Sequence, residues 1–245
     1  MTNLVIDIGN TLTKIAIFND DELLQVQQYQ QASTNDINKF VSGYQINTVI
    51  TSSVKTEKEH WQLLLEQNYK VIYFNSTITA GINNQYKTPG TLGPDRLAAI
   101  IGANYLYPQK NNIVISGGTC ITYDFVDAGA NYFGGSISPG LNMRYKAVNY
   151  YTAALPLITA DENFEGAYGD DTVSAIRSGV QNGIKYELQG FIENYINSKQ
   201  GYNIILSGGD SIFFDTLLKN SIFAPYIKIE PYLVLKGLNA AIQKQ

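Results

Sequence analysis

Apolar and polar positions alternate in short blocks from the start of the chain. Residues 4–6 form an apolar run, and residues 12–18 carry the β-branched and aromatic side chains that are typical of strands. Between these runs lies a polar turn at Gly9, Asn10 and Thr11. The pattern predicts a β-hairpin over residues 4–18, with Asp7 near its tip.

The later blocks predict strands and helices in alternation, which is typical of a mixed α/β fold. Predicted strands cover residues 22–29, 47–51, 71–74, 131–136 and 204–206. Predicted helices cover residues 36–41, 56–67, 94–107, 142–150, 170–197, 211–219 and 233–243. Gly179 and Gly183 lie one turn apart on the apolar stripe of the longest helix. Each costs up to about 1 kcal/mol there, so we expect close packing against another helix to offset that cost.

The first hairpin is repeated later in the chain. With an offset of 109 residues, positions 4–6 align with 113–115, Gly9 with Gly118, and Thr13 with Thr122. Two such units predict two similar domains, over residues 1–110 and 111–245. A duplicated pair of phosphate-gripping hairpins resembles the plan shared by sugar kinases, actin and heat-shock chaperone ATPases. That resemblance implies two ribonuclease H-like, actin-like ATPase domains with mixed sheets flanked by helices, and nucleotide in the cleft between them.

Composition excludes several classes of partner. The 245 residues have a formal net charge of −4 and only 16% charged positions, without a block of like charges, which disfavours nucleic acid as a partner. One cysteine and no Cys/His cluster suit a reducing compartment and argue against structural zinc. The sequence also lacks a signal-peptide pattern and an apolar stretch of roughly 20 residues. We therefore expect a cytoplasmic protein with no membrane partner.

Two acidic positions are candidates for chemistry. Asp7 follows a buried strand, so its ionised form needs a donor, a cation or a metal-bound water, and the adjacent glycine turn can hold a phosphate. The alternative is an ordinary hairpin with an Asx-turn. Asp95 and Arg96 follow Pro94 at a predicted helix N-terminus, where amide groups stabilise anions. The alternative there is a simple cap. His60, the single histidine, is expected to be structural, on a solvated helix face.

Four segments together resemble one family, the type III pantothenate kinases, which carry out the first committed phosphorylation toward coenzyme A. The segments are Asp7-Ile8-Gly9-Asn10-Thr11, Gly93-Pro94-Asp95-Arg96, Gly118-Thr119 with its flanking strands, and Ser207-Gly208-Gly209-Asp210. They match in order and spacing. The loop from Gly134 to Gly140, the stretch 152–156 and the helix start at Asp171-Thr172 extend the resemblance over nearly the whole chain.

The resemblance implies a role for each matching residue. Asp95 would be the general base that takes the proton from the pantothenate hydroxyl, and Asp7 would organise Mg²⁺ and the triphosphate. The implied ATP contacts are Asp7, Ile8, Gly9, Asn10, Thr11, Leu12, Thr13, Lys14, Thr119, Gly208 and Gly209. The implied pantothenate contacts are Tyr86, Gly93, Pro94, Asp95, Arg96 and Thr172, with the Arg96 fork suited to the substrate carboxylate. The family also implies a homodimer that completes the substrate site.

One position departs from the family pattern. The family usually carries an aspartate before its second Gly-Thr loop, which helps to bind an activating monovalent cation (K⁺ or NH₄⁺), and this chain has Ser116 there. A neutral hydroxyl replaces a charge, so we expect an active kinase with altered cation dependence, with water or a neighbour such as Asp124 compensating. Two alternatives remain: a kinase of another small hydroxylated substrate, and a nucleotide-binding regulatory relative without turnover.

Overall fold

The computed structural model describes residues 1–55, 58–196 and 201–244, which form two compact units. The first unit comprises residues 1–109, 129–133 and 232–245, and the second comprises residues 110–128 and 134–231. The end of the chain therefore packs with its beginning. The division into two domains at residues 110 and 111 remains a prediction. No helix among the described residues is long and apolar enough to span a bilayer.

The first unit is built on a five-stranded mixed sheet in the order β3-β2-β1-β4-β5. Its strands are β1 (Thr2–Ile8), β2 (Thr13–Asn19), β3 (Glu22–Tyr29), β4 (Thr48–Ser53) and β5 (Lys70–Tyr73). The first three form an antiparallel meander, and β4 and β5 add in parallel to β1. The predicted hairpin is confirmed, with Asp7 opposite Lys14 on β2 and beside Ser52 on β4.

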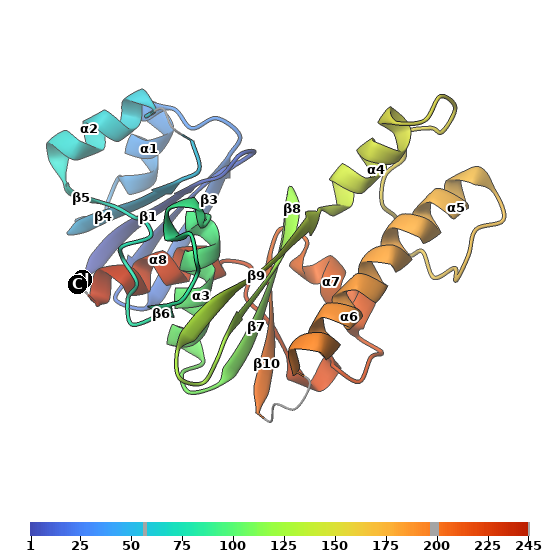
Figure 1. Cartoon of the computed structure of the whole chain (residues 1–245). Coiled ribbons are helices and arrows are strands. Elements are labelled where there is room, and N and C mark those ends of the chain that lie inside the picture. The colour runs from blue at the N-terminus through green and yellow to red at the C-terminus, as the bar shows by residue number, and fades with distance from the viewer. Residues whose placement is uncertain (56–57, 197–200, 245) are drawn as a thin grey trace. The chain divides into compact units, whose positions relative to one another are not determined.

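Helices cover both faces of this sheet (Figure 1). One face holds α1 (Thr34–Val41) and α2 (His60–Asn68), whose Phe40 and Trp61 pack with Leu4 and Ile6 of β1. The other face holds α3 (Pro94–Leu106) and α8 (Leu233–Gln243), which pack closely against each other. A Cβ on Gly237 of α8 would lie only 1.8 Å from the carbonyl oxygen of Ala98, so glycine is required at this helix crossing.

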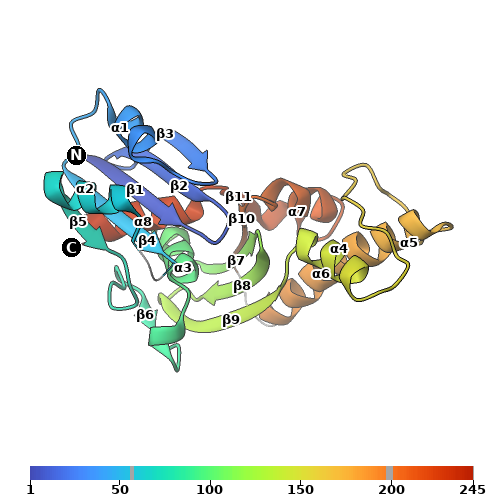
Figure 2. The same cartoon turned by 90° about the horizontal axis from the view of Figure 1, so that it is seen from above.

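The second unit repeats the same plan, as Figure 2 shows for its strands. Its sheet has the order β11-β10-β7-β8-β9, which corresponds strand for strand to the first sheet. The strands are β7 (Asn111–Gly117), β8 (Cys120–Val126), β9 (Asn131–Pro139), β10 (Tyr202–Gly208) and β11 (Ile227–Ile229). The first three residues of β9 belong to the first unit. A short strand, β6 (Asn83–Asn84), pairs with the first two residues of β9.

Four helices and a π-helical turn pack on one face of the second sheet. They are α4 (Leu141–Tyr150), α5 (Thr172–Arg177), the π-helical turn Ser178–Asn182, α6 (Gly183–Ile196) and α7 (Ser211–Leu218). Their apolar side chains cover Ile113 and Ile115 of β7 and Ile204 and Leu206 of β10. Alternate residues of these strands therefore point away from the helices.

The repeat is confirmed at the level of strands, but one detail of its alignment was wrong. An offset of 109 places the bounds of β1 on those of β7. The second turn is one residue shorter, because Thr122 lies opposite Ser116 as Lys14 lies opposite Asp7. Thr122 therefore corresponds to Lys14, and the alignment of Thr13 with Thr122 was wrong by one residue.

The long helix expected over residues 170–197 differs from the structure. It begins at Thr172 and is interrupted by the π-helical turn, and Asn197 lies outside the described residues. A Cβ on Gly179 or Gly183 would meet no described atom within 4 Å beyond the helix's own backbone, so the expected close helix packing was wrong. Gly179 instead lines a cavity together with Val148 of α4, so the space beside it is open. The helix expected over 56–67 begins at His60, which is exposed, while residues 56 and 57 lie outside the described residues.

Candidate active site

The position of Asp7 follows from the alternation of side chains along β1. Asn3, Val5 and Asp7 point to the same face of the sheet. The side-chain amide of Asn3 donates a hydrogen bond of 3.0 Å to Oδ1 of Asn239 on α8, which identifies this face as the one covered by α3 and α8. Asp7, at the carboxyl end of β1, therefore lies on the side of the sheet where α3 packs.

The Asp7 carboxyl group is buried and its charge is poorly balanced. The pKa of Asp7 is raised to about 7: burial has the largest effect and raises it, the positive charge of Lys14 lowers it, and the negative charge of Asp95 raises it. Because the charge of Lys14 does not offset the effect of burial, a further cation would stabilise the ionised form of Asp7. Asp95 is close enough to act on Asp7, so the structure brings these two predicted site residues together in the first unit.

Asp95 and Arg96 are presented by the first turn of α3. Gly93 is the N-cap and Pro94 occupies the first helical position, where its missing N–H costs nothing. A Cβ on Gly93 would lie 2.6 Å from Oδ1 of Asp95, so this glycine leaves space for the carboxylate. Arg96 is only 6% exposed. The predicted motif thus places an acidic and a basic group at one helix end.

Tyr86 supports Arg96 from the loop before α3. The Arg96 guanidinium carbon lies 5.7 Å from the centroid of the Tyr86 ring, within the range of a cation–π interaction. On β9, Tyr132 stacks with Tyr86 at 6.3 Å between centroids. The backbone N–H of Tyr86 donates to Oδ1 of Asn84 at 3.0 Å. Tyr86 is therefore held in place beside Arg96. The sequence analysis missed Tyr132 and Asn84, which contact Tyr86.

The first phosphate-binding turn is closed by its own backbone. The N–H of Gly9 donates to the carbonyl of Leu12 at 3.0 Å. Ile8 and Thr13 are buried at the two strand ends, while Asn10 and Thr11 are exposed. A short glycine turn with polar exposed residues suits contact with phosphate oxygens.

Ser52 is a further candidate that sequence reasoning did not single out. It lies beside Asp7 in the parallel β1–β4 register, and so points to the same face. Its side chain is 1% exposed, and its hydroxyl has no hydrogen-bond partner among the described residues. A buried hydroxyl of this kind normally bonds to water or a ligand. The available signal in the sequence was a polar residue near the end of a buried strand.

In the second unit, the corresponding strand ends carry Ser116 and the candidate ATP-binding glycines. Ser116 lies beside Ser207 and Gly117 lies beside Gly208 in the parallel β7–β10 register. Gly208 has φ of 80°, and a Cβ there would lie 2.2 Å from the carbonyl oxygen of Gly117, so glycine is required. Gly209 is exposed. The β7–β8 turn and the Gly208-Gly209 turn are therefore neighbours.

Thr119 lies exposed in the β7–β8 turn, where the N–H of Gly118 donates to the carbonyl of Cys120 at 3.0 Å. Thr172 is found elsewhere in the same unit, at the start of α5. The Asp171 carboxylate caps this helix by accepting hydrogen bonds from the N–H groups of Val173 and Ser174. Thr172 lines a cavity of about 440 Å³ whose other lining residues are apolar, namely Val148, Leu155, Ala175, Ile176, Gly179 and Val180.

The donor groups at the first turn fit Mg²⁺. No cluster of three or more His, Cys, Asp or Glu residues with metal-site geometry occurs in the described part of the chain. Mg²⁺ usually binds through one or two carboxylates together with substrate phosphates and water, which matches the lone buried carboxylate of Asp7. At the second turn, buried hydroxyl oxygens of Ser116, Ser207 and Ser211 have no partner among the described residues. These three hydroxyl groups are neutral. The Asp210 carboxyl group lies beside Gly117 at the same turn, and burial raises its pKa.

Solved structures with low sequence identity share the fold of this chain. An activator of 2-hydroxyisocaproyl-CoA dehydratase from Clostridium difficile, with bound ADPNP, has a TM-score of 0.56 at 11% identity, over 100% of this chain and 96% of that chain. An inorganic polyphosphate/ATP-glucomannokinase from Arthrobacter has a TM-score of 0.50 at 18% identity, over 99% and 98% of the two chains. The predicted fold class, an α/β actin-like fold with two mixed sheets flanked by helices, is confirmed.

Relatives of higher identity share a single description. The family model for type III pantothenate kinase matches residues 3–194. A type III pantothenate kinase from Phocaeicola vulgatus is 42% identical over 238 residues, 97% of this chain and 96% of the relative. Those from Bacteroides fragilis and Flavobacterium johnsoniae are each 40% identical, over 97% and 90% of this chain and 96% and 91% of the relatives. This chain belongs to the type III pantothenate kinase family.

Proposed function

We propose that this protein transfers the γ-phosphoryl group of ATP to the hydroxyl group of pantothenate, the first step toward coenzyme A. The observation that supports the proposal most is that Asp95 acts on Asp7 at the end of β1, while Arg96 follows Asp95 in the first turn of α3. A buried carboxylate that can take a cation, a second carboxylate that can act as a base and a guanidinium that can hold an anion are the groups that this reaction needs.

Asp95 is proposed as the general base. Phosphoryl transfer depends mainly on alignment and charge neutralisation, so a well-placed carboxylate can accept the hydroxyl proton as the oxygen attacks phosphorus. Arg96 is proposed to bind the pantothenate carboxylate with its planar fork. Because Tyr86 lies against the guanidinium, it orients Arg96 as well as lining the substrate site. Gly93, Pro94 and Thr172 complete the proposed substrate contacts.

The proposed ATP site uses both turns. The segment from Asp7 to Lys14 holds the triphosphate, Thr119 adds a contact from the second turn, and Gly208 and Gly209 lie on the adenosine side. Mg²⁺ held by Asp7 would, when bound, neutralise charge on the phosphate oxygens. Lys14 lies opposite Asp7 on β2 and adds a second positive charge at the same place.

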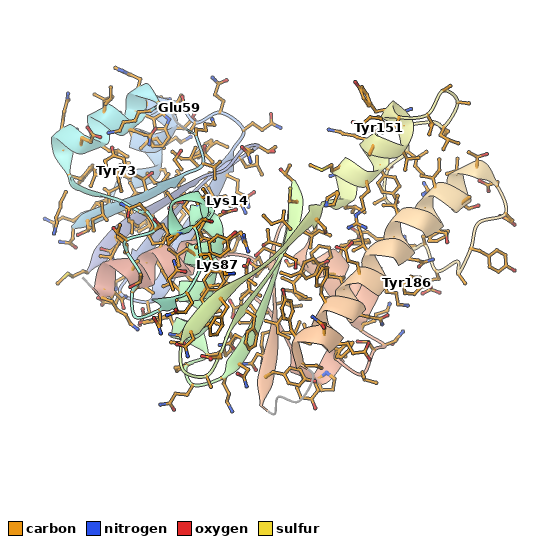
Figure 3. All side chains as sticks on the ribbon, in the orientation of Figure 1. Lys14, Glu59, Tyr73, Lys87, Tyr151 and Tyr186 are labelled. Carbon is orange, nitrogen blue, oxygen red and sulfur yellow. The ribbon has the colours of Figure 1, made fainter. Side chains whose placement is uncertain are left out.

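We further propose a cytoplasmic homodimer. Several large aromatic side chains of the second unit are exposed, including Tyr151 at the end of α4, with 81% exposed, and Tyr186 on α6, with 62% exposed (Figure 3). Aromatic residues are enriched at protein interfaces, which supports a self-association surface there. Sedimentation of the purified protein across a concentration series tests the dimer.

The experiment that tests the activity measures ADP release from purified protein with Mg-ATP and pantothenate, alone and against a panel of small hydroxylated acids and sugars. We expect ADP release that requires pantothenate. Release that requires a different acceptor would support the alternative kinase. Nucleotide binding without ADP release with any acceptor would instead support a regulatory protein without turnover.

Ser116 leads to a prediction about monovalent cations. We expect the wild-type rate to change less than about twofold between K⁺, NH₄⁺ and Na⁺ salts, because the hydroxyl supplies no charge for a cation. In Ser116→Asp, a carboxylate joins the neighbouring Ser207 hydroxyl, so K⁺ should raise the rate several-fold. Rates in matched chloride salts at constant ionic strength provide the measurement, and Ser116→Asn is the neutral control. Strong K⁺ activation of the wild-type protein would contradict this prediction.

A further inference from the structure

We propose that Glu187, on α6, is a positioning residue for ATP binding: it holds the β9–α4 corner that supports the Thr119 turn. This inference rests on the proposed function, since it takes that turn to be part of the ATP site. Glu187 belongs to none of the motifs that carry the family resemblance. It is linked to the turn by a continuous series of contacts within the second unit.

The corner and the turn are in direct contact. The N–H of Gly140 donates to the carbonyl of Thr119 at 3.1 Å. A Cβ on Gly140 would lie 2.2 Å from the carbonyl oxygen of Gly118 and 2.5 Å from that of Thr119. The backbones therefore approach as closely as two backbones can, and any shift of residue 140 must move the turn or break the hydrogen bond.

Arg144 connects this corner to Glu187. Its Nε donates to the carbonyl of Pro139 at 2.8 Å, and its Nη2 donates to Oε2 of Glu187 at 2.6 Å. The backbone N–H of Arg144 also donates to the carbonyl of Gly140 at 3.0 Å. One guanidinium thus fixes the peptide before Gly140 while its other edge is held by the carboxylate of Glu187.

The other carboxylate oxygen of Glu187 contacts two strands, β8 and β9. Oε1 accepts a hydrogen bond from the hydroxyl of Tyr123 on β8 at 2.7 Å and another from the hydroxyl of Ser138 on β9. Burial raises the pKa of Glu187, but the hydrogen bonds from Ser138, Arg144 and Tyr123 lower it by more than burial raises it. The net shift of the pKa is therefore downward. Ionised Glu187 therefore ties β8, β9 and α4 together.

A contribution to stability alone does not explain this arrangement of Arg144 and Glu187. The side chains of Arg144 and Glu187 are 19% and 23% exposed, and partly buried ion pairs give little net stability because desolvation offsets their attraction. Their geometry is specific, however, since both carboxylate oxygens and two guanidinium nitrogens have defined partners. The network therefore serves mainly to fix the Thr119 turn.

The test compares Glu187→Gln with the wild-type protein. Glutamine keeps the size of the side chain and one acceptor oxygen but removes the charge that holds Arg144. We expect the Kd for Mg-ATP and the KM for ATP to rise about tenfold, equivalent to about 1.4 kcal/mol. The turnover number and the KM for pantothenate should change less than about twofold. Glu193→Gln, an exposed position on the same helix, is the matched control and should leave every value unchanged.

Two further variants distinguish a positioning role of Glu187 from a structural one. Glu187→Asp, which retains the charge, should recover part of the nucleotide affinity, and Arg144→Ala combined with Glu187→Gln should raise the Kd no further than Arg144→Ala alone. Unchanged Kd in Glu187→Gln with a lowered melting temperature would overturn the proposal, because the role would then be structural. Calorimetric titration with Mg-ATP reads the Kd without turnover, so a wild-type protein that binds ATP but releases no ADP would refute the proposed function and still test Glu187.

Discussion

Replacing Asp95 with asparagine is expected to lower the turnover number with pantothenate by about 10² to 10⁴-fold, the usual contribution of a general base. The amide keeps the shape of the carboxylate and its place on the first turn of α3, but it cannot accept the hydroxyl proton. The Kd for Mg-ATP should stay within about threefold of the wild-type value, because Asp95 is proposed to act on the acceptor. Single-turnover ADP release and calorimetric titration measure the two quantities separately.

A second effect of Asp95→Asn distinguishes the loss of a base from a loss of structure. Asp95 raises the pKa of Asp7, so its neutralisation should lower the pKa of the Asp7 carboxyl group. NMR titration of that carboxyl group in the metal-free protein measures the shift. A variant that keeps more than a tenth of the wild-type turnover number would show that another group, or the substrate phosphate itself, accepts the proton. Glu193→Gln serves here as the control for a lost surface charge.

Periodicity and turn residues predicted most of the fold because the central strands of the two sheets, among them β1, β4, β7 and β10, are largely buried. Both hairpins, the strand over residues 22–29 and the helix over residues 233–243 were predicted from local patterns and are confirmed. Local patterns could not show that the last helix packs on α3, since that contact joins segments more than 100 residues apart in the sequence. They also could not reveal the π-helical turn, because one extra residue in a helix leaves its apolar positions nearly unchanged.

The candidate site was predictable where chemistry is concentrated in a few adjacent residues. Asp7 and the Asp95-Arg96 pair stand in short motifs, and the structure brings Asp7 and Asp95 together. The supporting residues could not be predicted. Ser52 enters the site through strand register, and Glu187 is linked to the second turn through Arg144 of α4 and the β9–α4 corner. Such residues carry no motif of their own, because their role depends on tertiary contacts.

Asp7→Asn is expected to have opposite effects on activity and on stability. Loss of the carboxylate removes the proposed protein ligand of Mg²⁺, so we expect the turnover number to fall at least about 100-fold and the KM for ATP to rise. In the metal-free protein, however, the substitution should increase the free energy of unfolding. Buried Asp7 has a pKa of about 7 in the folded protein, against the ordinary aspartate value of 3.8 expected for the unfolded chain, so the folded protein holds this proton more tightly.

The sign of the pH dependence follows from that difference. Below about pH 4 the group is protonated in both states and makes no difference to stability. As the pH rises to about 7, ionisation favours the unfolded chain, and the cost approaches about 4 kcal/mol at higher pH. Asp7→Asn should therefore match the wild-type protein near pH 4 and exceed its free energy of unfolding at pH 8, as measured by urea titration without metal or nucleotide.

Adding Mg-ATP should reverse the order of stability at pH 8. The wild-type protein gains stability from the ligand in proportion to the logarithm of its concentration over the Kd, whereas the variant, with its weakened site, gains little. A destabilised variant in metal-free buffer would show that Lys14 already balances the Asp7 charge, and that the carboxylate is a structural partner of β2. The predicted crossing of the two stability curves would instead show that the fold keeps an unfavourable charge in place for the cation that its substrate brings.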